Sequence, residues 1–202
     1  MTATESSRQV SRTEEQDALE EFSARFVKQS GMIYLANNFE EVISTVNDLI
    51  QQRGKGDSCC ALIKLLQNGL SVDMTKEIHS TIPFDDFQRN PRAIANRIDV
   101  GITKGEYAVA ETGSIVDISL SDEHRLLSSF SRVHIAVVER SRFLKKLQEL
   151  APRIRDLIGE KNSGMPKPSM TLIGGPSRTS DIELKSVLGV HGPHEVHVVV
   201  SG

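Results

Sequence analysis

Apolar residues along the first fifty positions alternate between helical and extended spacing. Four of them recur at the helical period and predict a first helix: Leu19, Phe22, Phe26 and Val27. Gly31 ends that helix, and the apolar stretch 32–36 then predicts a strand. Asn37 and Asn38 supply turn or N-cap chemistry before the next helix. The order is therefore helix, strand, turn.

A second helical stripe follows directly, formed by Val42, Ile43, Val46, Leu49 and Ile50. We expect it to stop near Gly54. A strand, a turn and a helix in succession are typical of a parallel or mixed sheet with helices packed on it. The apolar segment 58–70 has no clean period, and its pattern fits either a strand followed by a helix or one helix.

The second half of the chain is richer in extended patterns. Five apolar runs predict strands, at 107–110, 114–118, 133–138, 170–173 and 196–200. We expect a charged turn at 121–125, an exposed loop at 161–168 and a short helix at 181–188. Another helix is expected to start near Ser141 and to be kinked or split by Pro152. Together these elements indicate an α/β fold.

Composition places the chain among globular proteins. Hydrophobic residues make up 38% and charged residues 25% of 202 residues, which suits one domain. No apolar run approaches the roughly 20 residues that span a bilayer. The polar segment Met1 to Glu21 lacks the apolar core of a secretory signal. We therefore expect a cytoplasmic protein with a disordered lead-in at 1–18 and a single domain at 19–202.

Charge and cysteine content exclude several function classes. A net charge of −3 and an aromatic content of 4% without Trp argue against a nucleic-acid binder. Cys59 and Cys60 are adjacent, which gives too few ligands for zinc or an iron–sulfur cluster. We interpret them as small buried residues in a reducing compartment.

The segment from Ile173 to Glu183 contains candidate anion-binding chemistry. Two glycines after an apolar strand permit positive φ and close backbone approach. Hydroxyls, a guanidinium and the N-terminus of the expected helix would then suit a phosphate or carboxylate. The candidate ligand-binding residues are Gly175, Ser177, Arg178, Thr179, Asp181 and Glu183. The alternative is that the same residues only cap and favour the helix, and residue chemistry alone does not separate the two.

The tripeptide Glu111, Thr112 and Gly113 lies between two predicted strands. We expect Glu111 to be at least partly buried, so it needs a partner, a raised pKa or a ligand. It would then act as a base, a nucleophile or a ligand anchor. The alternative, which the residues alone favour, is a structural carboxylate at a bulge where Gly113 supplies the torsion.

Three histidines cluster near the C-terminus, at 191, 194 and 197. His194 and His197 are an odd number of residues apart at the start of a strand and point to opposite faces, so we expect no metal site. His191, beside Gly192 and Pro193, is the better site candidate, as a donor to an anion or as a general acid or base.

Several motifs occur in an order that resembles a known family. They are Gly101-Ile102-Thr103, residues 108–114 with the Glu-Thr-Gly element, the strand 133–138, residues 175–183 and residues 187–193. Together they resemble the lactate-utilisation (LUD) domain family, and most of all its short stand-alone branch, lactate utilisation protein C. The resemblance implies a three-layer α/β/α sandwich similar to the NagB/RpiA/CoA-transferase fold. One segment departs from the family pattern, because 125–131 lacks the proline usual before the strand at 133.

The resemblance also implies a role. Such proteins are one of three that together oxidise L-lactate to pyruvate in bacteria, and the two partners carry the iron–sulfur clusters. This chain lacks the cysteine spacing for a cluster, so it resembles the accessory subunit, with a small anionic or nucleotide-like ligand expected at the two loops. No cofactor is implied. An alternative is an independent acyl- or CoA-transferase-like or cyclo-ligase-like enzyme with Glu111 as nucleophile, which rests on fold-level analogy alone.

Overall fold

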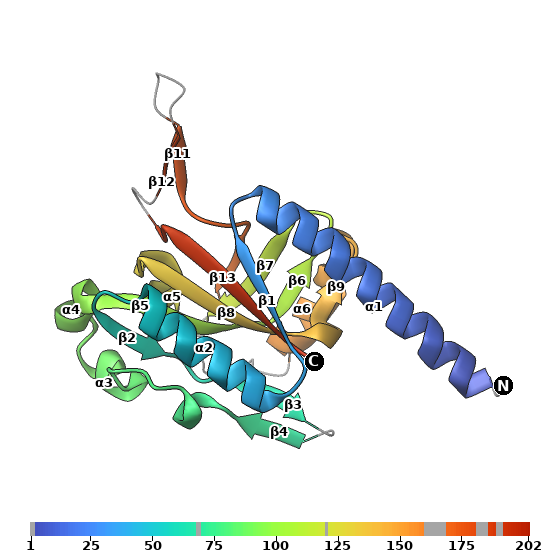
Figure 1. Cartoon of the computed structure of the whole chain (residues 1–202), viewed down its shortest axis with the longest axis horizontal. Helices are drawn as coiled ribbons and strands as arrows, with labels where there is room; N and C mark the ends of the chain where they lie inside the picture. The colour runs from blue at the N-terminus through green and yellow to red at the C-terminus, as the bar shows by residue number, and fades with distance from the viewer. Residues whose placement is uncertain (1–2, 68–69, 120, 160–168, 181–185, 189–191) are drawn as a thin grey trace.

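The centre of the molecule is a five-stranded parallel sheet, seen in a computed structural model that describes residues 3–67, 70–119, 121–159, 169–180, 186–188 and 192–202. Its strands lie in the order β1-β13-β8-β5-β2 (Figure 1). Their bounds are β1 Met32–Ala36, β2 Asp57–Cys60, β5 Ile98–Gly105, β8 Val133–Glu139 and β13 Glu195–Ser201. The first and last strands of the chain are therefore neighbours, and the chain crosses the whole sheet between β1 and β2.

Helix α2 (Phe39–Arg53) covers one face of this sheet. It begins at Asn38, whose side chain accepts a hydrogen bond from the backbone N–H of Glu41, as the sequence predicts. Its buried residues Val42, Val46 and Leu49 pack with the side chains that β5, β8 and β13 present on that face. The amphipathic stripe thus faces the sheet.

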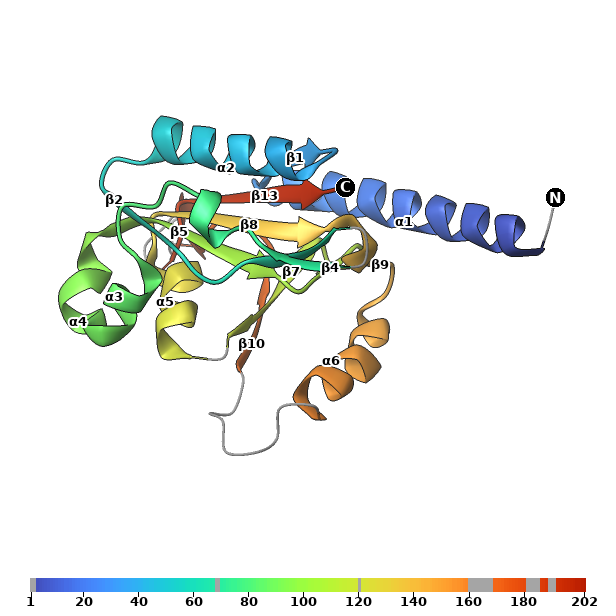
Figure 2. The same cartoon turned by 90° about the horizontal axis from the view of Figure 1, so that it is seen from below.

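The opposite face carries a second, four-stranded sheet in the order β10-β7-β6-β9 together with helices α1 and α5. The bounds are β6 Tyr107–Val109, β7 Ser114–Ser119, β9 Phe143–Leu144, β10 Ser169–Ile173 and α5 Asp122–Phe130. Helix α6 (Leu150–Gly159) packs on the far side of this second sheet. Figure 2 shows α2 on one side of the central sheet and α5 and α6 on the other. The predicted α/β fold, with a central sheet between helices, is confirmed.

Smaller elements lie around this core. Two hairpins pair antiparallel, β3 (Lys64–Gln67) with β4 (Leu70–Asp73) and β11 (Arg178–Ser180) with β12 (Ser186–Leu188). The short helices are α3 Phe84–Arg89, α4 Pro91–Ile94, η1 Thr75–Glu77, η2 Ala95–Arg97, η3 Arg140–Arg142 and η4 Leu147–Glu149.

The first helix, α1, spans Ala3–Lys28 and so runs through most of the segment expected to be a disordered lead-in. Its C-terminal half belongs to the core, because Leu19, Phe22 and Phe26 are buried against the second sheet and β13. The ring of Phe22 stacks on Phe26 at 5.1 Å and meets Phe143 edge-on at 5.2 Å. The division into 1–18 and 19–202 stays a prediction.

Four local predictions are wrong. The charged turn at 121–125 is the start of α5, whose N-cap Ser121 accepts from the N–H of His124. The helix expected from Ser141 is replaced by η3, β9 and η4 before α6 begins. The segment 58–70 contains strands β2 and β3 and no helix in its described part. The helix expected at 181–188 is wrong for its last three residues, because Ser186–Leu188 is a strand paired with β11, and 181–185 lie outside the described residues. The loop expected at 161–168 lies outside the described residues.

Both cysteines are buried and reduced in β2, as expected from their adjacency. Burial raises the pKa of the Cys59 thiol to about 12 and that of Cys60 further still. Neither sulfur is therefore available as a thiolate near neutral pH. Over the described part of the chain, no helix has the length and apolar content to cross a membrane.

The Phe22 cluster gives a test of whether α1 is part of the folded core. Replacing Phe22 by Ala should lower the free energy of unfolding by about 3–5 kcal/mol, since it removes a fully buried ring and leaves a cavity. Urea unfolding followed by circular dichroism measures this loss. The matched control is Val27→Ala on the same helix, where a side chain 54% exposed should cost little. Equal effects of the two changes would contradict a core role for α1.

Candidate functional site

The two loops singled out by the sequence lie beside each other at the C-terminal end of α1. The side-chain Nε2 of Gln29 donates to the backbone oxygen of Thr112 at 3.0 Å and lies 3.4 Å from that of Gly113. On the other loop, a Cβ added to Gly174 would lie 2.5 Å from Gln29 Oε1. Gln29 thus packs between the loops, a role for which its place at a helix end gave no sequence signal.

The glycines of both loops meet a conformational requirement. Gly113 has φ +61° and Gly175 has φ +136°, which side chains with a Cβ rarely adopt. A Cβ on Gly175 would also lie 2.7 Å from the backbone oxygen of Gln29. The predicted special torsion at Gly113 is confirmed, and both glycines allow the loops to approach the end of α1.

Glu111 is more exposed than the sequence predicts, with 42% of its side chain accessible. One carboxylate oxygen accepts from the backbone N–H of Leu147 at 2.9 Å, and the other lies 3.4 Å from Lys146 Nζ. The Leu147 N–H, supported by the Lys146 ammonium, holds the pKa of Glu111 below its ordinary value. The expected partial burial and the raised pKa are therefore wrong, whereas the expected partner is present, as the Leu147 N–H and Lys146. The ionised carboxylate of Glu111 thus stabilises the first residue of η4, Leu147, through its backbone N–H.

The remaining candidates on the second loop contact two different parts of the chain, the end of α1 and the segment before β13. Arg178 donates to the hydroxyl of Ser30, at the end of α1, at 2.7 Å. The backbone N–H of Ser177 donates to the carbonyl of Pro193 at 2.8 Å. Thr179 lies in β11, which pairs with β12 at 186–188, where the sequence predicts the end of a helix. Asp181, Glu183 and His191 lie outside the described residues.

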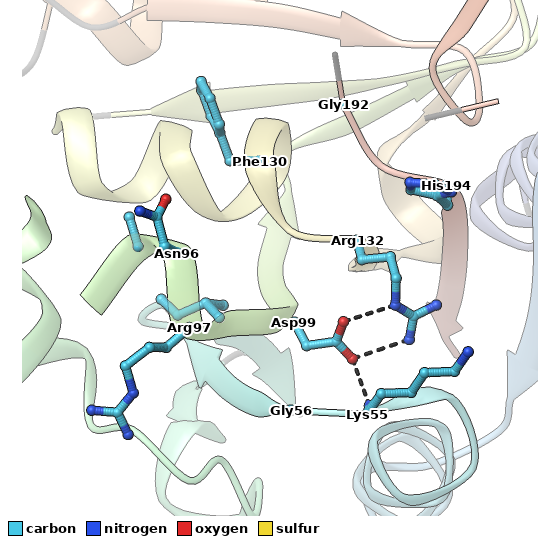
Figure 3. A pocket seen from close by; sticks show the side chains of 11 residues that line it. Lys55, Gly56, Asn96, Arg97, Asp99, Phe130, Arg132, Gly192 and His194 are labelled. Atoms are coloured by element: carbon cyan, nitrogen blue, oxygen red, sulfur yellow. Dashed lines mark hydrogen bonds and ion pairs between the residues drawn. The ribbon is translucent and has the colours of Figure 1, made fainter. Parts of the chain in front are cut away.

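A cavity of about 640 Å³ opens at the edge of the central sheet where its strands begin. Four chain segments meet there, each directly before or at the start of a strand: Lys55 and Gly56 before β2, Ala95 to Asp99 at β5, Phe130 and Arg132 before β8, and Gly192 and His194 before β13 (Figure 3). Parallel strands bring their amino ends to one edge, which explains why positions so far apart in sequence line one cavity.

An ion pair forms the floor of this cavity. Arg132 Nε lies 2.7 Å and Nη2 3.0 Å from the two carboxylate oxygens of Asp99, and Asp99 also accepts from the backbone N–H of Lys55 at 2.6 Å (Figure 3). Partial burial on its own raises the pKa of Asp99, but Arg132 and the N–H of Lys55 outweigh it and hold the pKa below its ordinary value. The pair is charged at neutral pH and joins β5 to β8.

The second loop adjoins this cavity, although Glu111 and Arg178 do not line it. A Cβ on Gly192 would lie 3.0 Å from the Cβ of Ser177, and the Ser177–Pro193 hydrogen bond joins the two segments. Sequence reasoning missed Lys55, Asp99 and Arg132. Their only signal is that each precedes or opens a strand, which reveals nothing until the strand order is known.

A buried polar cluster lies between α5 and strands β5, β7 and β8. His134 Nε2 lies 2.9 Å from the hydroxyl of Thr103, and His124 Nε2 lies 3.2 Å from Asp117 Oδ1. Burial raises the pKa of Asp117, but His124 and Ser128 hold it below its ordinary value, whereas burial lowers the pKa of His134 to about 4. Among the described residues, no three His, Cys, Asp or Glu side chains gather closely enough to hold a metal ion.

The lowered pKa of His134 predicts a pH dependence of stability. Between pH 6.5 and 4 the unfolded chain binds a proton at this residue and the folded chain does not, so the free energy of unfolding falls as pH decreases. The contribution of this one group is up to about 1.4 kcal/mol per pH unit. Replacing His134 by Gln should remove it, as urea unfolding at pH 7, 6 and 5 would reveal. The exposed His79→Gln should keep the wild-type slope, and an unchanged slope in His134→Gln would contradict the assignment.

Several proteins of known sequence resemble this chain. A protein named lactate utilization protein C from Shouchella clausii is 35% identical over 102 residues, covering 50% of this chain and 43% of that protein. One of the same name from Macrococcus caseolyticus is 27% identical over 162 residues, covering 80% and 68%. The uncharacterized protein YkgG of Escherichia coli is 34% identical over 100 residues, covering 49% and 42%. The chain thus spans a little under half the length of most of these relatives.

Structural and family comparisons agree with this result. A crystal structure of a DUF162 family protein from Deinococcus radiodurans superposes with a TM-score of 0.60 at 20% identity, covering 93% of this chain and 98% of that one. At that identity the similarity establishes the fold alone. The family described as LUD domain matches residues 19–201, nearly the whole chain. The chain therefore belongs to the LUD domain family.

Proposed function

We propose that this protein is the component without iron–sulfur clusters in a bacterial L-lactate utilisation system. The observation that carries the proposal is the LUD domain match over residues 19–201, together with relatives named lactate utilization protein C. The system as a whole oxidises L-lactate to pyruvate, and separate iron–sulfur proteins are the partners. The reduced thiols of β2 fit a cytoplasmic location, since that compartment keeps cysteines unpaired.

The cysteines explain why the clusters would belong to the partners. A cluster takes four thiolate ligands, and this sequence has two cysteines. Cys59 and Cys60 are successive residues of β2, so their side chains point to opposite faces of the sheet. Both are fully buried and protonated, which opposes metal binding further. Electron transfer would then be carried out by the iron–sulfur proteins.

We extend the proposal to a small anion bound where the two loops meet. Support comes from their adjacency around Gln29 and from the guanidinium of Arg178 near the end of α1. The positive φ of Gly113 and Gly175 lets both loops pack closely against the end of α1, which brings them together. Glu111 would orient it from the neighbouring loop. The hydrogen bonds that Glu111 already accepts give no support to a role as acyl nucleophile, so an independent transferase is not favoured.

The first test is genetic. Deleting the gene from its host should abolish growth on L-lactate and leave growth on pyruvate intact, because only the oxidation step is lost. The plasmid-borne wild type should restore growth, and tagged protein should co-purify with iron-containing partners detected by their visible absorbance. Normal growth of the deletion strain on L-lactate, with no iron-containing protein captured, would contradict the proposal.

The second test separates the structural role of Glu111 from a role in the ligand site. Glu111→Gln keeps an oxygen to accept from the Leu147 N–H but loses the charge. We expect the variant to fold with a near-normal melting temperature and to slow growth on L-lactate when it replaces the wild type. Glu40→Gln, an exposed carboxylate in the first turn of α2, is the matched control and should grow normally. Equal growth of the two strains would assign Glu111 to structure alone.

A further inference from the structure

The cavity at the strand-start edge has two walls of different chemistry. The apolar lining residues are Ala95, Ile98 and Phe130, which also lie together around a second, smaller hollow at the end of α5. On the other side of the cavity lie the nitrogen-bearing side chains of Lys55, Arg132 and His194 (Figure 3). Phe130 is 74% exposed and ends α5 directly at the cavity, so its ring is open to an entering ligand.

The cations that line this cavity differ in whether a described carboxylate lies beside them. Arg132 is paired with Asp99 and lies 3.5 Å from Glu195, so its charge is balanced within the fold. Arg97 is likewise paired with Asp57 at 2.7 Å. Within the described part of the chain, no carboxylate lies within 4 Å of the Lys55 ammonium. An anion entering the cavity would therefore meet Lys55, with the imidazole of His194 on the same side (Figure 3).

The volume restricts the size of the occupant. Cofactor and drug-sized ligands occupy sites of roughly 300–1,000 Å³, and this cavity of about 640 Å³ lies in the middle of that range. A three-carbon hydroxy acid such as lactate has six heavy atoms and would leave most of the space to solvent. The occupant needs an anionic group and, several ångströms away, a flat apolar part.

We propose that this cavity binds a nucleoside monophosphate or a nucleotide built on one. The phosphate lies against Lys55 and His194, and the base stacks on Phe130. Asn96, on the same side of the cavity as Phe130 (Figure 3), supplies a carboxamide, the group best suited to pair with the edge of a base through one donor and one acceptor. This site is separate from the anion site proposed at the two loops, and it requires no role in lactate utilisation.

The test uses the purified full chain and adenosine monophosphate, with inorganic phosphate and L-lactate as comparison ligands in calorimetric titrations. We expect adenosine monophosphate to bind at least about tenfold more tightly than phosphate, since stacking of one base contributes about 1–3 kcal/mol. Phe130→Ala should weaken binding of the nucleotide on the order of tenfold and leave phosphate binding unchanged. Lys55→Gln should weaken both. Both changes are at exposed side chains, so the variants should fold, and melting curves check this.

Arg89→Gln is the control, because this arginine is exposed on α3 and pairs with Asp86 away from the cavity. It should bind the nucleotide as the wild type does. Absence of adenosine monophosphate binding at millimolar concentration, or binding that neither Phe130→Ala nor Lys55→Gln weakens, would overturn the inference. Binding of L-lactate as tight as that of the nucleotide would overturn it as well. Because the titrations need no partner, their failure is distinguishable from failure of the genetic test.

Discussion

The burial of β8 on both faces is the constraint on which the rest of the structure depends. All seven of its residues are buried, and it lies between β13 and β5 at the centre of the parallel sheet. A strand in that position needs apolar layers on both sides, because its side chains alternate between the two faces. Helix α2 supplies one layer, and the second sheet with α1 supplies the other. The N- and C-terminal strands complete the same sheet side by side.

This arrangement decides where loops can carry chemistry. Since all five strands run parallel, every segment that enters a strand arrives at one edge and every segment that leaves arrives at the other. The cavity lies at the entry edge, fixed by the Asp99–Arg132 pair that joins two adjacent strands. The loops around Gln29 are attached to the second sheet and α1 instead. The cavity and the two loops therefore lie on different parts of the fold and have different chemistry.

The core elements were predictable because the spacing of their apolar residues matches the faces that are buried in the sheet. The run 133–138 is apolar except for His134, as suits a central parallel strand, and the stripe of α2 matches its one buried face. Predictions failed where tertiary contacts decide the conformation. Residues 121–125 were predicted as a charged turn because α5 buries only Leu127 and Ser128, which lie outside that stretch. The segment 186–188 is a strand because it pairs with β11, a partner that its own spacing cannot reveal.

The same distinction, between burial that spacing reveals and positions that tertiary contacts decide, explains which site residues the sequence could predict. A carboxylate between two predicted strands is costly to bury, which made Glu111 a candidate, but the loop turns it outward, where it contacts the Leu147 N–H and Lys146. The sequence does not single out Lys55, Asp99 and Arg132, because isolated charged residues at the starts of strands are common. The motifs that carry the family resemblance nevertheless reach the cavity, since Ser177 in one is hydrogen-bonded to Pro193 in the other, next to Gly192 in the wall. The Gly-Pro-Ser loop can therefore shape that wall without contacting a ligand itself. Its two glycines, Gly174 and Gly175, let the chain pass close to Gln29 so that Ser177 can reach Pro193.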